Sequence, residues 1–148
     1  MILFKSLFLA LSLFLFIGCQ DSATNEKTIL KEHEHICPQC NMPFSINKHS
    51  SIYKEIKFDD IGCMILWAKE HDVDLSKIET KIYLNEQKKY INSKDAYYKI
   101  DGRTPMNYGF VAYEKNCDEC IKFDEVILKM LRGEHLGNPK IRKKVLGY

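Results

Sequence analysis

The chain has 148 residues, with 22 Lys and Arg against 20 Asp and Glu, and 45% of its residues are hydrophobic. This length accommodates one domain or two very small ones. A formal net charge of +2 with 28% charged residues excludes highly charged disordered chains and strongly basic nucleic-acid binders. Six cysteines and five methionines are the unusual part of the composition, so the main question is what this sulfur does.

Residues 1–18 have the pattern of an export signal. Lys5 is followed by an apolar or small run to Gly18 that is too short to be a stable membrane span. The run ends at Cys19, and this junction resembles the bacterial lipobox, in which the signal is cleaved and the cysteine carries a lipid. We therefore expect a lipid anchor at Cys19 and a polar tether to residue 35, with the protein facing the periplasm. An uncleaved short anchor is the alternative.

The rest of the chain predicts an α+β fold with short strands. Residues 51–58 mix β-branched, aromatic and charged side chains, as a half-exposed strand does. A helix is expected over about 60–71, capped by Asp59 or Asp60, because apolar residues recur there at core spacing. Four further strands are expected, at 81–84, 89–91, 96–100 and 108–113.

A second helix is expected over about 124–132, with Gly133 as its stop. The residues after it, 134–148, are predicted to be a basic tail that is frayed over 140–144. Without residues 1–18 the chain keeps 21 basic against 20 acidic residues and is nearly neutral, so we expect no non-specific attraction to nucleic acid or to anionic lipid.

One short match suggests an internal duplication. Residues 56–61 recur as residues 121–126 with four identities, and both copies lie where a strand is expected to lead into a helix. Met42 and Met106 stand at similar distances before the two copies, each beside a proline. In a duplicated fold the two thioethers could therefore converge on one site. Similar capping of two unrelated helices is the alternative explanation.

Cys40 and Met42 place a thiol and a thioether close together in a turn-rich segment. This pair of ligands favours Cu(I), whereas zinc prefers cysteine, histidine and carboxylate. Met106 also lies in a polar, proline-containing loop, where filling a core is a poor explanation. Met64 and Met130, in contrast, stand at helical core positions and are expected to be packing residues.

Two C-x-x-C pairs compete with the copper interpretation. Cys37 with Cys40 and Cys117 with Cys120 could form a tetrathiolate zinc site if the pairs meet in space. A disulfide in the second pair is equally compatible with an oxidising compartment. A thiol redox role requires such a pair at a helix N-terminus, and neither pair is well placed for it. Cys63 is predicted to be a buried helix thiol.

Taken together, these features resemble the NosL family, the lipid-anchored copper-binding accessory proteins of nitrous oxide reductase maturation. The resemblance is carried by Cys19 and by four stretches, at residues 37–43, 58–67, 95–98 and 104–112. It implies one NosL-like domain over 36–133, made of two small pseudo-repeated ββαβ halves with mainly antiparallel strands. It also implies a lipoprotein that faces the periplasm and is not an enzyme.

The resemblance implies that Cu(I) is bound by Cys40, Met42 and Met106, with Cys37 assisting. Asn41 stands where the family has a glycine. This replacement is compatible with the motif, because asparagine also adopts the left-handed backbone conformation. The implied partners are an ABC-type maturation transporter and its periplasmic partner protein, with nitrous oxide reductase as the final copper recipient. No nucleic-acid partner is expected.

Cys117 and Cys120 lie outside the pattern of the family. A second metal site or a disulfide therefore remains open for this pair. A structural zinc or thiol redox lipoprotein that uses both cysteine pairs is the alternative to the copper chaperone.

Overall fold

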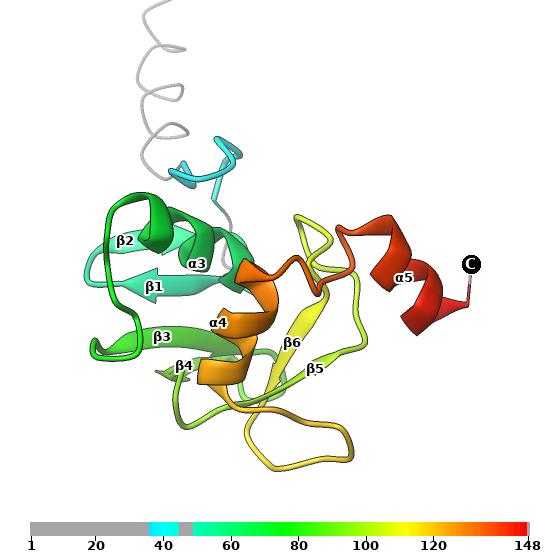
Figure 1. Cartoon of the computed structure of the whole chain (residues 1–148). Helices are drawn as coiled ribbons and strands as arrows, with labels where there is room; N and C mark the ends of the chain where they lie inside the picture. Colours follow the sequence, from blue (N-terminus) through cyan, green and yellow to red (C-terminus); the bar gives the residue numbers. More distant parts are fainter. Residues whose placement is uncertain (1–35, 45–48, 148) are drawn as a thin grey trace, which may run out of the picture. The chain divides into compact units, whose positions relative to one another are not determined.

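The computed structural model describes residues 36–44 and 49–147 (Figure 1). The described residues all belong to one compact unit, residues 33–148. The predicted export signal, the lipid anchor at Cys19 and the tether therefore lie outside the described residues. Among the helices that are described, none combines the length and the apolar character needed to cross a membrane.

Four short antiparallel strands form one sheet in the order β2-β1-β3-β4. They are β1 (Ser51–Tyr53), β2 (Ile56–Phe58), β3 (Thr80–Leu84) and β4 (Lys89–Asn92). The prediction of one continuous strand over 51–58 is wrong. The backbone turns at Lys54, which has a φ of 54°, so the two halves of this segment pair as a hairpin with Tyr53 opposite Ile56.

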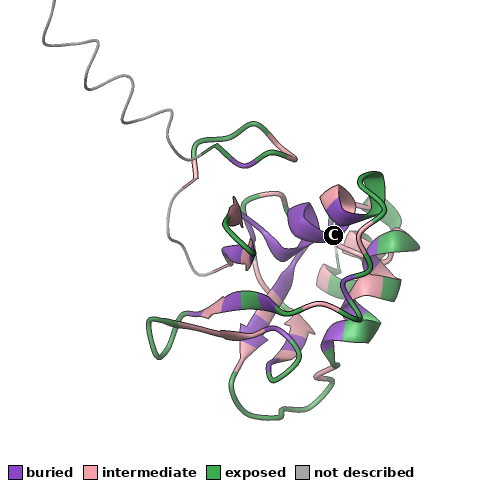
Figure 2. Ribbon diagram, turned by 90° about the vertical axis from the view of Figure 1, so that its left-hand side faces the viewer, coloured by how far each residue is buried: buried purple, intermediate pink, exposed green. Residues whose placement is uncertain are grey.

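The second sheet contains two antiparallel strands, β5 (Tyr97–Ile100) and β6 (Phe110–Tyr113). Both lie within predicted strands, and the expected loop joins them. Tyr98 also forms a bridge to Ile121, so the segment before the second helix is tied to β5. The core lies between these sheets and two helices, α3 and α4 (Figure 2).

Helix α3 (Ile61–Glu70) matches the first predicted helix. Asp60 is its N-cap, and the Asp60 carboxylate accepts a hydrogen bond of 2.9 Å from the Gly62 backbone N–H. Such a cap satisfies one of the otherwise unpaired amides of the first turn. The apolar spacing seen in the sequence corresponds to the buried side, which contains Ile61, Cys63, Met64, Ile65 and Ala68.

Helix α4 (Phe123–Leu131) matches the second predicted helix and packs against α3. The predicted fraying of the tail is wrong, because the chain forms a further helix, α5 (Pro139–Leu146). The two ends of α5 carry residues that commonly start and stop helices. The Asn138 side chain accepts a hydrogen bond of 3.1 Å from the Lys140 amide at the start, and Gly147 adopts a φ of 80° at the end.

The α+β class with antiparallel strands is confirmed, but the duplication is not. In the first copy of the repeated hexapeptide, Phe58 ends a strand and the helix begins three residues later. In the second copy the equivalent residue, Phe123, is already the first residue of α4. Within the described residues α4 is followed by α5 and not by a strand, so the second half is not a ββαβ unit.

Candidate metal centre

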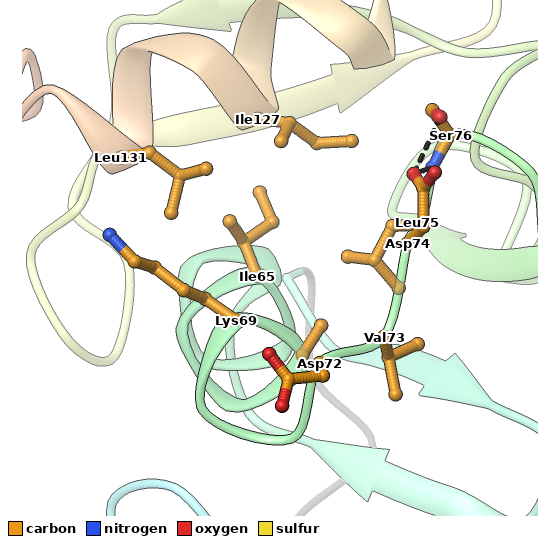
Figure 3. Close-up of a pocket in the computed structure, with 10 residues that line it drawn as sticks. Ile65, Lys69, Asp72, Val73, Asp74, Leu75, Ser76, Ile127 and Leu131 are labelled. Carbon is orange, nitrogen blue, oxygen red and sulfur yellow. Dashed lines mark hydrogen bonds between the residues drawn. The ribbon is translucent and has the colours of Figure 1, made fainter.

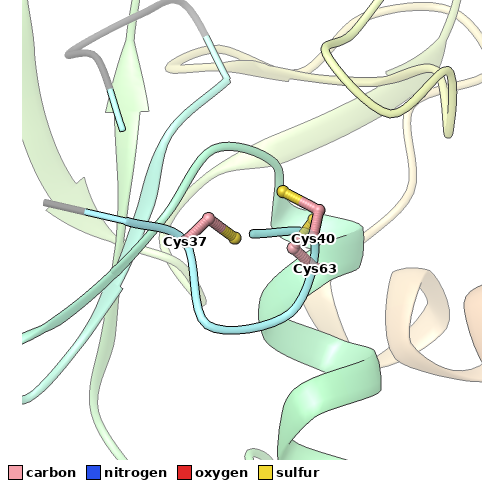
Figure 4. Close-up of side chains that lie close together, drawn as sticks. All are labelled: Cys37, Cys40 and Cys63. Carbon is pink, nitrogen blue, oxygen red and sulfur yellow. The ribbon is translucent and has the colours of Figure 1, made fainter. Parts of the chain in front are cut away.

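Three cysteine side chains come together beside the N-terminus of α3 (Figure 4). The Sγ atoms of Cys37, Cys40 and Cys63 all lie within 4.8 Å of one another. Cys37 and Cys63 are buried, and Cys40 is partly accessible. We call these three residues the cysteine cluster.

The first two cysteines are held by a closed loop. Ile36 and Pro43 bridge its ends, and the Cys37 N–H donates a hydrogen bond of 2.9 Å to the Met42 carbonyl. The Asn41 N–H donates another of 2.9 Å to the Cys37 carbonyl. Asn41 has a φ of 57°, the left-handed conformation expected from its place in the motif. The loop can therefore turn back within four residues and hold both thiols near α3.

The third cysteine was not predicted to be part of the site. Cys63 lies in the first turn of α3, and the Asp60 cap fixes where that turn begins. In the sequence, Cys63 falls on the apolar side of the helix, so its spacing is explained by burial alone. The position of Cys63 in the sequence could have indicated its role. A cysteine just after an N-cap residue lies at the N-terminal end of the helix, where a loop can reach it.

Hydrogen bonds to sulfur stabilise a thiolate in the cluster. The Cys63 thiol donates to Cys37 Sγ, which also accepts from the backbone amides of Asp59, Cys40 and Gln39. These donors, chiefly the Cys63 thiol, lower the pKa of Cys37 to about 5 despite its burial. Donation to Cys37 raises the pKa of Cys63, and burial raises that of Cys40. These hydrogen bonds therefore favour ionisation of Cys37 over ionisation of Cys40 or Cys63.

Two buried carboxylates border the cluster. Cys40 Sγ donates to Asp59 Oδ2 over 3.9 Å. Asp60 caps α3 with one oxygen and accepts a hydrogen bond of 3.4 Å from the Met106 backbone N–H with the other. Burial raises the pKa of Asp60 to about 6, even though the Thr104 side chain and two backbone amides stabilise the carboxylate. Asp60 thus joins the loop that contains Met106 to the helix that contains Cys63.

The two methionines predicted as ligands have different surroundings. Met42 is 45% exposed, and its backbone N–H donates to Cys40 Sγ. Met106 is partly buried and packs against the core, and its loop is held at α3 by Asp60. Both methionines belong to loops that are tied by hydrogen bonds to the cluster or to the helix that bears it. Their role as ligands remains a prediction.

Cys117 and Cys120 form a disulfide in the loop between β6 and α4, with their Cα atoms 5.2 Å apart. Their sulfur atoms are bonded to each other, so neither offers a free thiol to a metal. The sulfur partner of Cys37 and Cys40 in this structure is Cys63.

A second hollow, of about 330 Å³, lies between α3, the loop that follows it and α4 (Figure 3). Ile65, Ile127 and Leu131 give it apolar walls, and the Ser76 hydroxyl at its edge donates to the Asp74 carboxylate. None of the three clustered cysteines lines this hollow. It is therefore separate from the candidate metal centre.

No protein-family model, curated protein or solved structure matches this chain. The three sulfur atoms of the cluster are close enough to hold a metal ion between them.

Proposed function

We propose that the chain binds Cu(I) at the cysteine cluster and acts as a metallochaperone. The observation that carries the proposal is the convergence of three sulfur atoms within 4.8 Å, one of them stabilised as a thiolate. Thiolate and thioether ligands favour Cu(I) among the biological metals. Met42 and Met106, on the two adjoining loops, would add the thioether ligands.

A chaperone must also release its cargo, and the accessibility of the cluster suits this requirement. Cys40 is partly accessible and Met42 is exposed, whereas Cys37 and Cys63 are buried. An incoming thiolate or thioether from a partner would meet the Cys40 side of the cluster first. Transfer would then proceed by exchange of ligands around the metal, and it requires no catalytic group.

Resemblance to the NosL family suggests the client. We propose that copper passes through an ABC-type maturation transporter and its periplasmic partner protein to nitrous oxide reductase. The predicted lipid at Cys19 would keep the chaperone at the membrane, facing the periplasm. Deletion of the gene should leave nitrous oxide reductase present but low in copper, and restoring the wild-type chain, but not Cys63→Ser, should restore its copper content.

Zinc is the second candidate, because a carboxylate lies beside the cluster. Asp59 Oδ2 is 3.9 Å from Cys40 Sγ, and three thiolates with one carboxylate would complete a tetrahedral zinc site. Such a site would be closed and structural, with no cargo to release.

Metal analysis separates the two candidates. A chain lacking the predicted signal is purified without added metal and loaded anaerobically with either ion. The copper proposal predicts one Cu(I) per chain that survives competition with a chromogenic Cu(I) chelator, together with weak zinc binding. Zinc retained through purification in a one-to-one ratio, and lost in Asp59→Ala, would favour the structural site.

A further inference from the structure

The C-terminal helix carries a concentrated positive charge that the copper site does not use. Four of the eight residues of α5 are basic, and none is acidic. In the described part of the chain, the ion pairs join other residues and none involves α5. The near-neutral total charge of the protein therefore conceals a strongly cationic segment.

The helical repeat gathers three of these charges on one side. Lys140, Lys143 and Lys144 are spaced by three and four residues, which places them on one face of a helix. All three side chains are exposed. We call these residues the lysine face. The opposite side of α5 carries Ile141, Val145 and Leu146, of which Val145 is exposed and the other two are partly buried.

The helix is fixed to the folded unit at its N-terminal end. Leu136 is buried, and its amide donates a hydrogen bond of 3.1 Å to the Tyr108 carbonyl. The Asn138 side chain donates one of 3.0 Å to the Gly133 carbonyl while it caps α5. Figure 1 shows α5 at one side of the folded unit. The lysine face therefore belongs to a helix that is anchored to this unit.

The acidic groups nearest to α5 already have partners. Glu119 and Glu125 line a hollow with Lys144, but they pair with Lys99 at 3.4 Å and with Lys129 at 3.7 Å. On the other side, Asp101 lines a hollow of about 400 Å³ with Arg103 and Arg142. Its carboxylate accepts a hydrogen bond of 2.9 Å from the Tyr113 hydroxyl. Within the described residues no ion pair therefore joins these carboxylates to α5.

We propose that the lysine face binds the anionic surface of a phospholipid membrane. A basic, weakly apolar helix is suited to lie on lipid headgroups, because each lysine near such a surface gains electrostatic attraction while apolar side chains sit at the boundary. Arg103 and Arg142, which line one hollow together with Asp101, supply further cationic groups for headgroup phosphates. This contact would hold the folded unit at the membrane independently of its metal and of any lipid on the chain.

The experiment measures partitioning of the full chain into vesicles of phosphatidylcholine alone and into vesicles that also contain phosphatidylglycerol. The binding free energies of an N-terminal anchor and of the lysine face add. The anchor contributes equally to both kinds of vesicle, so the ratio of the partition coefficient with phosphatidylglycerol to that without it measures the electrostatic contribution to binding. We expect the wild-type ratio to fall by about 100-fold in Lys140→Gln/Lys143→Gln/Lys144→Gln, and to fall similarly for the wild type near 1 M salt.

A matched control removes the same charge elsewhere. Lys81, Lys88 and Lys115 are exposed and lie outside α5, so their replacement by glutamine should leave the ratio close to that of the wild type. Replacement of the lysine face by three arginines should also preserve it. Equal loss in both glutamine variants, or no wild-type preference for phosphatidylglycerol, would overturn the proposal. So would binding of a DNA duplex through the same lysines without any vesicle preference.

Discussion

The Cys63 thiol donates a hydrogen bond to Cys37 Sγ, and this contact joins the first turn of α3 to the loop before β1. It is the largest cause of the low pKa of Cys37, which falls to about 5. The contact therefore favours the thiolate form of Cys37 before any metal arrives. A soft cation binds the thiolate form, so this hydrogen bond prepares the cluster for a metal.

Removal of this donor should raise the pKa of Cys37. In the metal-free protein, ultraviolet absorbance of the thiolate should titrate with a midpoint near pH 5. In Cys63→Ala the midpoint should move to higher pH. Burial still disfavours the Cys37 thiolate, and the hydrogen bond that stabilises it most is gone. Cys117→Ser/Cys120→Ser is the control and should leave the midpoint in place. An unchanged midpoint in Cys63→Ala would mean that the backbone amides alone stabilise the thiolate.

Asp60 should make the metal-free protein less stable as the pH rises from about 4 to about 6. Burial raises the pKa of its carboxyl from 3.8 to about 6 in the folded state, so the folded chain holds a proton that the unfolded chain has lost. The associated loss in the free energy of unfolding is roughly 3 kcal/mol. In Asp60→Asn this share of the pH dependence should vanish, although asparagine can still cap α3. Urea unfolding at several pH values measures the difference, and parallel curves for the two proteins would contradict the prediction.

Gly62 should be intolerant of a side chain. A Cβ atom at this position would lie 2.7 Å from Tyr108 Cγ and 2.8 Å from Met130 Cε. We expect Gly62→Ala to lower the free energy of unfolding by about 1–3 kcal/mol, as overpacking of a core does. The clash involves a ring, so the cost should shrink in the Tyr108→Ala background. A thermal unfolding cycle of the four proteins tests this, and equal costs in both backgrounds would show that Tyr108 is not the obstruction.

Met106 should contribute to copper affinity through its sulfur and not through its bulk. Met106→Leu preserves the volume, so the protein should keep its thermal stability while its Cu(I) affinity falls by roughly 10-fold. Met42→Leu should behave similarly. The control is Met130→Leu, which changes a buried core methionine and should leave affinity unchanged. Competition with a chromogenic Cu(I) chelator gives the affinities. Wild-type affinity in both Met42→Leu and Met106→Leu would mean that neither thioether is a ligand and that only cysteines bind the metal.

Local signals in the sequence predicted the helices better than the turns. The Asp60 cap and the apolar spacing after it located α3, because both act within one or two turns of the chain. The hairpin between β1 and β2 was missed, because Lys54 carries no residue preference for the positive φ that the turn requires. Helix α5 was missed because its charges suggested a solvated tail, although Asn138 and Gly147 mark its two ends.

The candidate site could be predicted only in part. The adjacent thiols of Cys37 and Cys40 follow from the sequence, since a C-x-x-C turn brings its own cysteines together. Cys63 could not be assigned in this way, because its approach depends on how the loop packs against α3. The disulfide between Cys117 and Cys120 was one of two alternatives that local spacing leaves equal.

In the copper proposal, Cys63 completes a metal site with Cys37 and Cys40. The most direct measurement is an anaerobic Cu(I) titration of Cys63→Ser, with Cys117→Ser/Cys120→Ser as the matched control. Loss of a direct ligand should weaken binding by more than about 100-fold, whereas the control should still bind one Cu(I) per chain with wild-type affinity. Wild-type affinity in Cys63→Ser would show that Cys63 is not a ligand, and loss of copper in the control would show that the metal is bound at Cys117 and Cys120 instead.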